Sequence, residues 1–498
     1  MESNMTGPGK VKLILALSLV TAATLACGLV SGSAPTPVTA TPEPTSARPT
    51  SEIGATEAAP TEPAGGATDS AAPTEGVDPT AGPTSKLDLA CLIFSSSGVQ
   101  CLGADGLRTF TDADYEQAVS YASDIAMCGD RVAIAYYDEI VFFDGESFES
   151  LPVALSDEAY GIDDVTCDPS GSRLAVSASG GFALLYEDGQ WQEFNMKEWD
   201  RDEDDEYTDV TDVALDSHGN LWVGLSYNLA RWDGQAWTVF DGKDTDWEDR
   251  SVYQLAVAPN DELFASVDGL LLKIAGDEVT VIETETIFGA YAFEAAGDTL
   301  LIGHGFGAYI VDHQGQSLAE HPVGERPELP FAATIYGLGL DGAGRLWMAT
   351  SYGLVVADAD GAYQLFMMSN TDLLDNAIGG MALAGSPALP PTVEHVPGQL
   401  TGVILQGGKP MVDASVVACV IDYSSDAACD GDPNFATTKT DADGRFTFTA
   451  LPRGYYAVYV QVEGGEWQYL DDPDGFFLSD PLVEPGSVVD LGVTQPNE

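Results

Sequence analysis

Short runs of alternating apolar and polar residues, separated by turn residues, fill most of the chain. The clearest example is residues 216–240, DSHGNLWVGLSYNLARWDGQAWTVF, in which the runs Leu221–Leu225, Leu229–Trp232 and Trp237–Phe240 are separated by turns rich in Asp, Asn and Gly. Alternation with a period of two is typical of half-buried strands, and Asp and Gly suit turns that need positive φ or local side-chain hydrogen bonds. The segment therefore predicts three consecutive antiparallel strands.

The same unit recurs along the sequence. The segment that begins at Asp341, DGAGRLWMATSYGLVVADADGAYQLF, shares the pattern D-x-x-G-x-L-W-x-x-x-S-Y-x-L with the first, and weaker copies begin near residues 129, 168, 259 and 297. Successive copies start about 40 residues apart, which is the spacing of four-stranded β-propeller blades. A short apolar run precedes each copy, for example Val210–Leu215 and Ile335–Leu340, and is expected to form the innermost strand of its blade.

The two ends of the repeat region complement each other. Residues 89–110 contain middle strands with no apolar run before them, whereas Ile378–Ala384 is an apolar run with no blade after it. Pairing of the last run with the first unit would close the ring and leave no open sheet edge. Inner runs near residues 125, 162, 210, 252, 290, 335 and 378 thus predict a seven-bladed β-propeller over residues 87–385 of an all-β protein.

The excess of acidic over basic residues argues against some classes of binding partner. The chain of 498 residues contains 19 Lys and Arg against 79 Asp and Glu, a formal net charge of −60. Such a field repels nucleic acid and anionic lipid headgroups, so direct binding of either is not expected. It suits solubility, salt tolerance or the binding of divalent cations.

The first residues have the pattern of a targeting segment. Lys10 and Lys12 precede an apolar run over residues 13–26 that is too short for an ordinary membrane-spanning helix. The run ends in small residues before Cys27, which resembles the lipobox of bacterial lipoproteins. This resemblance implies that residues 1–26 are a signal peptide and that a lipid on Cys27 anchors the protein to the bacterial cell membrane, exposed at the cell surface. Plain secretion is the alternative. Residues 27–86, rich in Pro, Thr and Ala, predict a disordered stalk.

The remaining cysteines suit disulfide bonding in an exported protein. Their spacing is not that of a CxxC zinc or redox site, and connectivities other than local ones stay open. We predict three local pairs, namely Cys91–Cys101 across a hairpin turn, Cys128–Cys167 at the ends of neighbouring inner strands, and Cys419–Cys429 on either side of a loop.

The repeat resembles a known family. The pattern L-W-V-G-L-x-x-x-L-x-x-W-D-G at residues 221–234, with its counterpart from Leu346, is similar to the two-component-regulator propeller repeat. In that family the repeats form extracellular sensors of hybrid histidine kinases and also occur in free-standing surface proteins. The resemblance implies a propeller that works outside the cytoplasm.

The last hundred residues carry a second resemblance. A Pro-rich segment, residues 386–397, is expected to link the ring to residues 398–495, which contain G-x-P-x-x-x-A-x-V, T-D-x-x-G-x-F-x-F and L-P-x-G-x-Y. This series is similar to carboxypeptidase-regulatory-like domains, and implies a small Ig/transthyretin-like β-sandwich that acts as a spacer or adhesion module. Asp441 and Asp443 in its T-D-A-D-G turn are candidate Ca²⁺ ligands, although turn chemistry also explains them.

Two long acidic loops, residues 195–209 and 241–250, should emerge on one face of the ring, because each joins an outer strand to the next inner strand. Carboxylates beside exposed aromatic rings suit sugar hydroxyls or Ca²⁺ and stacking on pyranose faces. No cofactor is required, and without EF-hand spacing Ca²⁺ is only an option. The alternative is solvated loops whose tryptophans pack locally. The candidate ligand-binding residues are Trp199, Asp202, Asp204, Asp205, Tyr207, Trp247 and His304.

The sequence contains no HExxH, GxSxG or P-loop motif, and we predict no catalytic residue. The prediction is a non-catalytic, surface-anchored binding protein whose propeller face recognises an extracellular polysaccharide or protein. One alternative is an extracytoplasmic hydrolase or lyase that acts on carbohydrate. Another is a sensor or scaffold subunit for a separate membrane signalling protein.

Overall fold

The computed structural model describes residues 87–94, 98–111, 113–115, 121–199, 209–243, 245–248, 250–283, 290–305, 307–322, 333–420, 429, 435–463, 465–471 and 480–497. The predicted signal peptide, the lipidation site Cys27 and the stalk up to residue 86 lie outside these residues. Within the described ranges, no helix is both long and apolar enough to cross a membrane.

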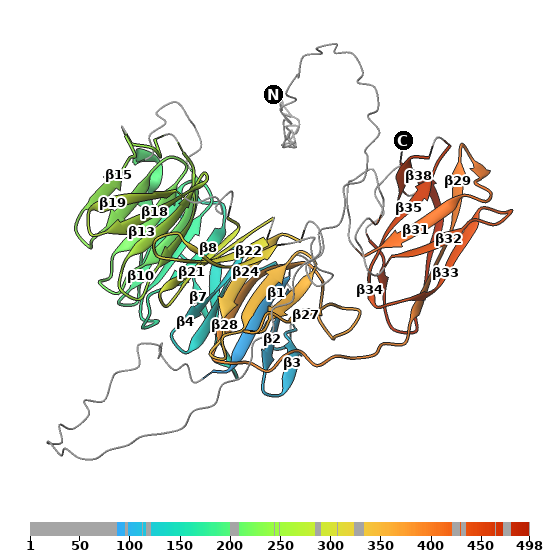
Figure 1. The fold of residues 1–498 in the computed structure, drawn as a ribbon, viewed down its shortest axis with the longest axis horizontal. Helices are drawn as coiled ribbons and strands as arrows, with labels where there is room; N and C mark the ends of the chain where they lie inside the picture. The colour runs from blue at the N-terminus through green and yellow to red at the C-terminus, as the bar shows by residue number, and fades with distance from the viewer. Residues whose placement is uncertain are drawn as a thin grey trace, which may run out of the picture. The chain divides into compact units, whose positions relative to one another are not determined.

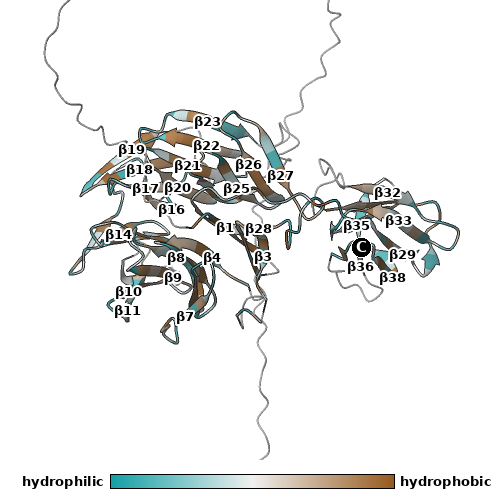
Figure 2. Cartoon of the chain, turned by 90° about the horizontal axis from the view of Figure 1, so that it is seen from below, coloured by the Kyte–Doolittle hydropathy of each residue, from teal (hydrophilic) through white to brown (hydrophobic). Residues whose placement is uncertain are grey.

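Seven four-stranded antiparallel sheets form a propeller, which confirms the predicted blade number (Figure 1). Figure 2 shows inner strands of successive blades nearest the centre of the ring and outer strands at its periphery. The strands are, for blade 1, β28 (Ile378–Ala384), β1 (Leu89–Phe94), β2 (Gly98–Gly103) and β3 (Gly106–Thr109); for blade 2, β4 (Asp124–Cys128), β5 (Arg131–Ala135), β6 (Glu139–Phe143) and β7 (Phe148–Pro152); for blade 3, β8 (Ile162–Cys167), β9 (Leu174–Ala178), β10 (Phe182–Glu187) and β11 (Gln190–Asn195), followed by the 3-10 turn η1 (Met196–Glu198); for blade 4, β12 (Val210–Leu215), β13 (Leu221–Leu225), β14 (Leu229–Trp232) and β15 (Trp237–Phe240); for blade 5, β16 (Val252–Val257), β17 (Leu263–Val267), β18 (Leu270–Ala275) and β19 (Glu278–Glu283); for blade 6, β20 (Ala292–Ala296), β21 (Thr299–His304), β22 (Gly307–Asp312) and β23 (Ser317–Pro322); and for blade 7, β24 (Ile335–Leu340), β25 (Leu346–Thr350), β26 (Gly353–Ala357) and β27 (Tyr363–Phe366).

The ring closes as the sequence predicts. Strand β28 pairs antiparallel with β1, with Leu92 opposite Met381, so the innermost strand of blade 1 comes from the end of the propeller segment. The first blade is therefore built from both ends of the repeat region, and the sheet leaves no unpaired edge at this junction.

The recurring Asp-x-x-Gly turn has a clear physical cause. Asp341 Oδ1 accepts the backbone N–H groups of Ala343 and Arg345, and its Oδ2 accepts the indole N–H of buried Trp347 at 3.0 Å. The same contacts recur at Asp216, whose carboxylate accepts the indole N–H of Trp222 at 3.1 Å. One carboxylate thus fixes the turn and satisfies the buried indole, which explains why Asp and Trp recur six residues apart in the two clearest repeats.

Each blade buries both of its faces against its neighbours. The core is divided into clusters that lie between adjacent blades, such as the one that joins blades 2 and 3 through Ile140, Ile162 and Val176. Because both faces are covered, the middle strands are almost continuously apolar, as in Leu263–Val267, where all residues are buried.

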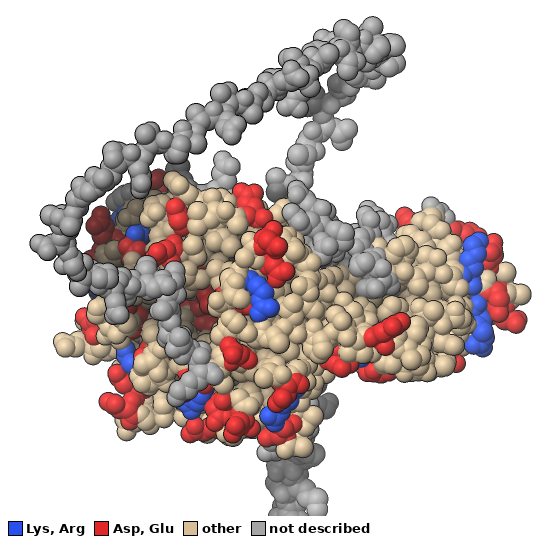
Figure 3. Space-filling view, turned by 60° about the horizontal axis from the view of Figure 1, so that its bottom comes forward, with Lys and Arg blue, Asp and Glu red and all other residues tan. Residues whose placement is uncertain are grey.

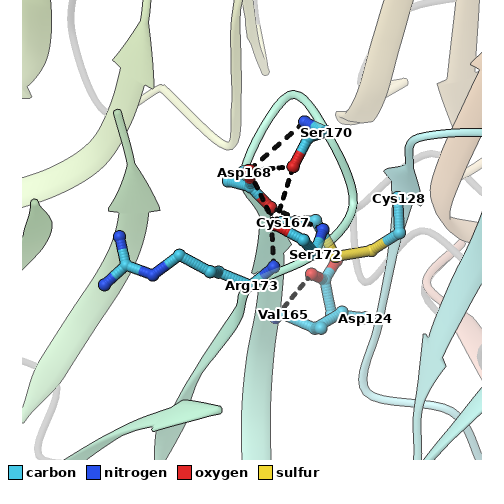
Figure 4. Close-up of a disulfide and its surroundings, with 8 residues drawn as sticks. All are labelled: Asp124, Cys128, Val165, Cys167, Asp168, Ser170, Ser172 and Arg173. Atoms are coloured by element: carbon cyan, nitrogen blue, oxygen red, sulfur yellow. Dashed lines mark hydrogen bonds between the residues drawn. A yellow bond between two sulfur atoms is a disulfide. The ribbon is translucent and has the colours of Figure 1, made fainter. Parts of the chain in front are cut away.

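Three disulfides form among the described residues, in the predicted pairs. Cys91 and Cys101 lie directly opposite each other on β1 and β2. The Cys128–Cys167 bond joins the ends of the inner strands β4 and β8, and so links blades 2 and 3 (Figure 4). Disulfides are consistent with an extracytoplasmic location.

Five inner strands share one irregularity at their beginning. In blades 1, 3, 4, 5 and 7 the pairing with the second strand skips one residue, which is a β-bulge. A bulge points two consecutive side chains away from the regular alternation, and such sites occur often beside binding sites. The skipped residues are Gly379, Asp163, Thr211, Tyr253 and Tyr336.

The residues after the propeller form further β-structure with its own core, which includes Leu400, Phe446, Phe448 and Tyr456. Strand β29 pairs parallel with β38 and antiparallel with β33, in a sheet of order β30-β29-β38-β36-β35-β31-β32. Its identity as a carboxypeptidase-regulatory-like sandwich stays a prediction. The strands are β29 (Gly398–Gln406), β30 (Lys409–Pro410), β31 (Ser415–Cys419), β32 (Ala436–Lys439), β33 (Arg445–Leu451), β34 (Gly454–Tyr455), β35 (Ala457–Gln461), β36 (Trp467–Asp471), β37 (Leu482–Val483) and β38 (Val488–Pro496).

Candidate ligand-binding face

Three exposed tyrosines surround a pocket where blades 2 and 3 meet. Tyr121, Tyr137 and Tyr160 are 66%, 65% and 70% exposed, which is unusual for large aromatic side chains in this protein. The pocket has a volume of about 520 Å³. We call it the tyrosine pocket, and its lining residues are Tyr121, Ser123, Tyr137, Tyr160, Gly161, Ile162 and Asp163.

The topology of the blades brings these residues to one face. Tyr121 and Tyr160 precede the inner strands β4 and β8, and Tyr137 lies in the turn between β5 and β6. Strand β4 runs away from this face and β5 returns to it, so the β5–β6 turn lies at the end of the sheet where β4 begins. The loops that the sequence analysis expected to carry the ligand also lead into inner strands, and therefore end on this same face.

A backbone hydrogen bond between the two blades fixes the position of Tyr137. Ile162 N–H donates to the carbonyl of Tyr137 at 3.0 Å, which ties the turn of blade 2 to the inner strand of blade 3. Gly161 has a φ of 129°, and a Cβ added to it would lie 2.9 Å from Cδ2 of Tyr137. The ring of Tyr137 therefore rests on the Gly161 backbone, where no side chain other than hydrogen fits.

Asp163 provides the charge in the tyrosine pocket. It is the skipped residue of the β8 bulge, so it lies outside the regular pairing of β8 with β9. The Ser179 hydroxyl lies 2.9 Å from Oδ1 and 2.7 Å from Oδ2 of Asp163. Burial raises the pKa of Asp163, the Ser179 hydrogen bond opposes this, and the nearby carboxylates of Asp209 and Asp164 raise it further.

A row of carboxylates continues from Asp163 around the ring. Asp124 accepts the Val165 N–H at 3.0 Å, as Figure 4 shows beside the Cys128–Cys167 bond. The next two blades repeat this contact. Asp164 accepts the Val213 N–H at 3.1 Å, and Asp212 accepts the Leu255 N–H at 2.5 Å. These N–H groups lie on strands whose inner edge has no partner strand, so the carboxylates satisfy an exposed sheet edge.

These inner-strand aspartates also influence one another. Burial raises the pKa of Asp124 and of Asp212 well above the usual range, and the neighbouring carboxyl group of Asp164 raises both further. Within the described residues, no three His, Cys, Asp or Glu side chains are placed to share a metal ion. The structure gives these aspartates a role in joining blades.

Further exposed tyrosines lie on the same face. Tyr253, Tyr291 and Tyr336 stand at the beginnings of the inner strands β16, β20 and β24. The hydroxyl of Tyr253 donates to Asp268 at 2.7 Å, and the rings of Tyr291 and Tyr336 lie 6.1 Å apart. The sequence analysis missed these tyrosines, although an alignment of the seven inner strands would have shown a Tyr at or just before the start of most of them.

The prediction for Trp247 is wrong, because its side chain is only 2% exposed. Gly242, with a φ of 60°, lets the chain fold back so that the indole lies on the glycine backbone and packs between blades 4 and 5. Trp199 is half-buried, with its ring 6.2 Å from that of Trp237 and its carbonyl accepting from Asn228. Both tryptophans pack locally, which was the alternative for these loops. The acidic and aromatic candidates Asp202, Asp204, Asp205 and Tyr207 lie outside the described residues.

The other candidates serve local structure. His304 is 4% exposed and stacks on Tyr309 with ring centroids 5.1 Å apart, and burial lowers its pKa. Asp441 accepts the N–H groups of Asp443 and Arg445, both at 2.9 Å. The latter bond is the main cause of the lowered pKa of Asp441. This is the same turn geometry as in the propeller repeats, and calcium binding at Asp441 and Asp443 stays a prediction.

Acidic side chains outnumber basic ones on the surface. Figure 3 shows Asp and Glu scattered over the face in view, with few Lys and Arg among them. The electrostatic field of this surface favours cationic ligands over anionic ones.

Comparisons with known proteins identify structural neighbours at low sequence identity. No protein-family model matches the sequence, and no curated protein was found to be similar to it. Solved structures with a similar fold include a streptogramin B lyase, with a TM-score of 0.42 and 10% identity over 52% of this chain and 86% of that chain. PorZ, a surface component of the type-IX secretion system of Porphyromonas gingivalis, has a TM-score of 0.42 and 15% identity over 75% and 62% of the two chains. The WD40 propeller domain of Doa1 has a TM-score of 0.40 and 12% identity over 58% and 89%.

Proposed function

We propose that the protein is an extracytoplasmic, non-catalytic binding protein, held at the cell surface by a lipid on Cys27. Its propeller face that carries the tyrosine pocket binds an extracellular polysaccharide or protein. The observation that carries this proposal is the tyrosine pocket itself, in which exposed aromatic rings and one carboxylate converge at a junction of two blades. Exposed tyrosines are typical of recognition surfaces, because they offer a large rigid contact area and a polar hydroxyl group.

The absence of cleavage is part of the proposal. Asp124 and Asp164 accept backbone N–H groups and Asp163 accepts the Ser179 hydroxyl, and each of these contacts serves the structure. A binding protein needs only rigid placement of such groups, which the inter-blade hydrogen bonds provide.

Binding of the purified protein to a panel of extracellular polysaccharides and proteins tests the proposal, with the length of each ligand followed over time. We expect saturable binding of an intact ligand that weakens at least about tenfold in Tyr160→Ala. Tyr253→Ala is the matched control, since this tyrosine is also exposed but lies in blade 5. If the ligand becomes shorter over time, the protein cleaves it and the proposal of a non-catalytic binding protein is refuted. Equal effects of the two substitutions would move the site elsewhere on the face.

The anchor is tested separately. Cys27→Ser should abolish incorporation of labelled fatty acid and release the protein from the membrane fraction into the medium. A protein that stays in the membrane fraction after this substitution would contradict lipid anchoring at Cys27.

A further inference from the structure

We propose that the tyrosine pocket binds an organic ammonium group, and that this group is the side chain of a lysine in an extracellular protein partner. The inference rests on the proposed function and deepens it by naming the chemistry of the ligand.

The lining has the composition that binds a cation. Tyr121, Tyr137 and Tyr160 supply three aromatic rings to the lining of one pocket, and Asp163 supplies a carboxylate. A cation near the face of an aromatic ring is attracted by the negative potential of that face, and several rings around one cation add their effects. Among the described residues that line the pocket, none is Lys, Arg or His, so none of them competes as a cation for the carboxylate.

The segments that carry the lining residues add further negative charge. Residues 121–125, 135–140 and 156–164 contain no Lys, Arg or His. An anionic ligand would have to approach against this field, whereas a cation is drawn in. The acids that contribute to this field are Asp138, Glu139, Asp157, Glu158, Asp163 and Asp164; Asp124 is not counted, because burial raises its pKa well above the usual range.

The geometry of Asp163 favours an ammonium over a guanidinium. An arginine binds a carboxylate best with two parallel N–H bonds, which need both oxygens free on one side. Here the Ser179 hydroxyl already lies within hydrogen-bond distance of both oxygens, at 2.9 and 2.7 Å. An ammonium needs only one remaining acceptor site, and a carboxylate with its several lone pairs still offers one.

The rest of the pocket suits a lysine better than an amino sugar. Gly161 and Ile162 form an apolar part of the lining against which the methylene groups of a lysine can pack. The ring hydroxyls of an amino sugar would need several polar partners around the ammonium, and the polar side chains among the described lining residues are Ser123, Asp163 and the three tyrosines.

Calorimetric titration of the purified full-length protein tests the inference, with capped tripeptides that contain a central lysine, arginine or norleucine. Norleucine has the same aliphatic arm without the charge. We expect the lysine peptide to bind at least about tenfold more tightly than the norleucine peptide, and to weaken as salt is raised. Equal binding of the lysine and norleucine peptides, or tighter binding of the arginine peptide, would overturn the inference.

Substitutions in the tyrosine pocket test whether the lysine peptide binds there. Asp163→Asn keeps the shape of the side chain and its acceptor for Ser179, and should weaken the lysine peptide at least about tenfold without affecting the norleucine peptide. Tyr160→Ala should weaken binding, whereas Tyr160→Phe keeps the ring and should restore most of it. Tyr253→Ala is the control with unchanged affinity. Unfolding midpoints of all variants are measured, so that a folding defect is recognised.

Two further outcomes separate this inference from the proposed function. If a ligand from the extracellular panel binds through the pocket but lysine peptides neither bind nor compete, the ammonium inference fails and the proposed function stands. Binding of chitosan oligomers in preference to lysine peptides would assign the ammonium to an amino sugar and overturn the choice of a protein partner.

Discussion

The disulfide between blades 2 and 3 should contribute more to stability than the disulfide within blade 1. Cys128 and Cys167 close a loop of sequence separation 39, whereas Cys91 and Cys101 close one of separation 10. In the chain-entropy account, a cross-link stabilises by restricting the unfolded chain, and the effect grows with the logarithm of loop length. The expected contributions are about 4 kcal/mol for the longer loop and about 3 kcal/mol for the shorter one.

The position of the two bonds should widen this difference. Cys91 and Cys101 are directly opposite on paired strands, which the hairpin already holds together. Cys128 and Cys167 join inner strands of two separate blades, where the bond Asp124–Val165 is a further link (Figure 4). The loss of the inter-blade disulfide removes a constraint that no hairpin replaces.

The comparison uses two double variants, Cys128→Ser with Cys167→Ser, and Cys91→Ser with Cys101→Ser, so that no unpaired thiol remains. Urea unfolding of each is followed by tryptophan fluorescence and by far-ultraviolet circular dichroism, because coincident curves show that the transition is cooperative. We expect the inter-blade variant to lose more unfolding free energy, by about 1 kcal/mol or more. An equal or smaller loss for that variant would refute the reasoning from loop length and blade position.

Three other substitutions test contacts inside the propeller. The folded protein holds the proton on Asp212 more tightly than the unfolded chain does, because the pKa of this acid is raised, so the protein loses stability as pH rises. Asp212→Asn removes this titration and should therefore raise the melting temperature at pH 7, with less effect near pH 4; a lower melting temperature at pH 7 would contradict this. Asp341→Ala should cost about 3 kcal/mol in urea unfolding, since the buried indole N–H of Trp347 loses its acceptor, and a loss below about 1 kcal/mol would argue against that hydrogen bond. Gly353→Ala should lower the melting temperature more than Gly361→Ala does. Both glycines have positive φ, but only at Gly353 would a Cβ lie 2.5 Å from a carbonyl oxygen of β27, so equal melting temperatures would count against this clash.

The blades could be predicted from the sequence because their determinants are local. Asp216 and Asp341 fix turns through contacts with residues two and four positions further on, and the strands between the turns carry a simple apolar alternation. Ring closure could also be predicted, since an apolar run without a blade, Ile378–Ala384, matched a blade without an inner strand. Both inferences use spacing alone.

The tyrosine pocket could not be predicted in this way. Its rings come from the β5–β6 turn of one blade and from the beginnings of two inner strands, and the β8 bulge that turns Asp163 toward it leaves no mark in the sequence pattern. Trp247 shows the opposite error. An acidic loop suggested exposure, but the backbone at Gly242 folds the indole into the core.

The pairing of β28 with β1 also determines when the protein can finish folding. Leu92 meets Met381 only after nearly the whole propeller segment has been synthesised. Contacts of such high sequence separation form late and slowly, because a long stretch of chain must be ordered first. Until then blade 1 presents an open strand edge on which another nascent chain could pair. A chain truncated before residue 378 would therefore not form a smaller ring, but an incomplete one with a permanent site for aggregation.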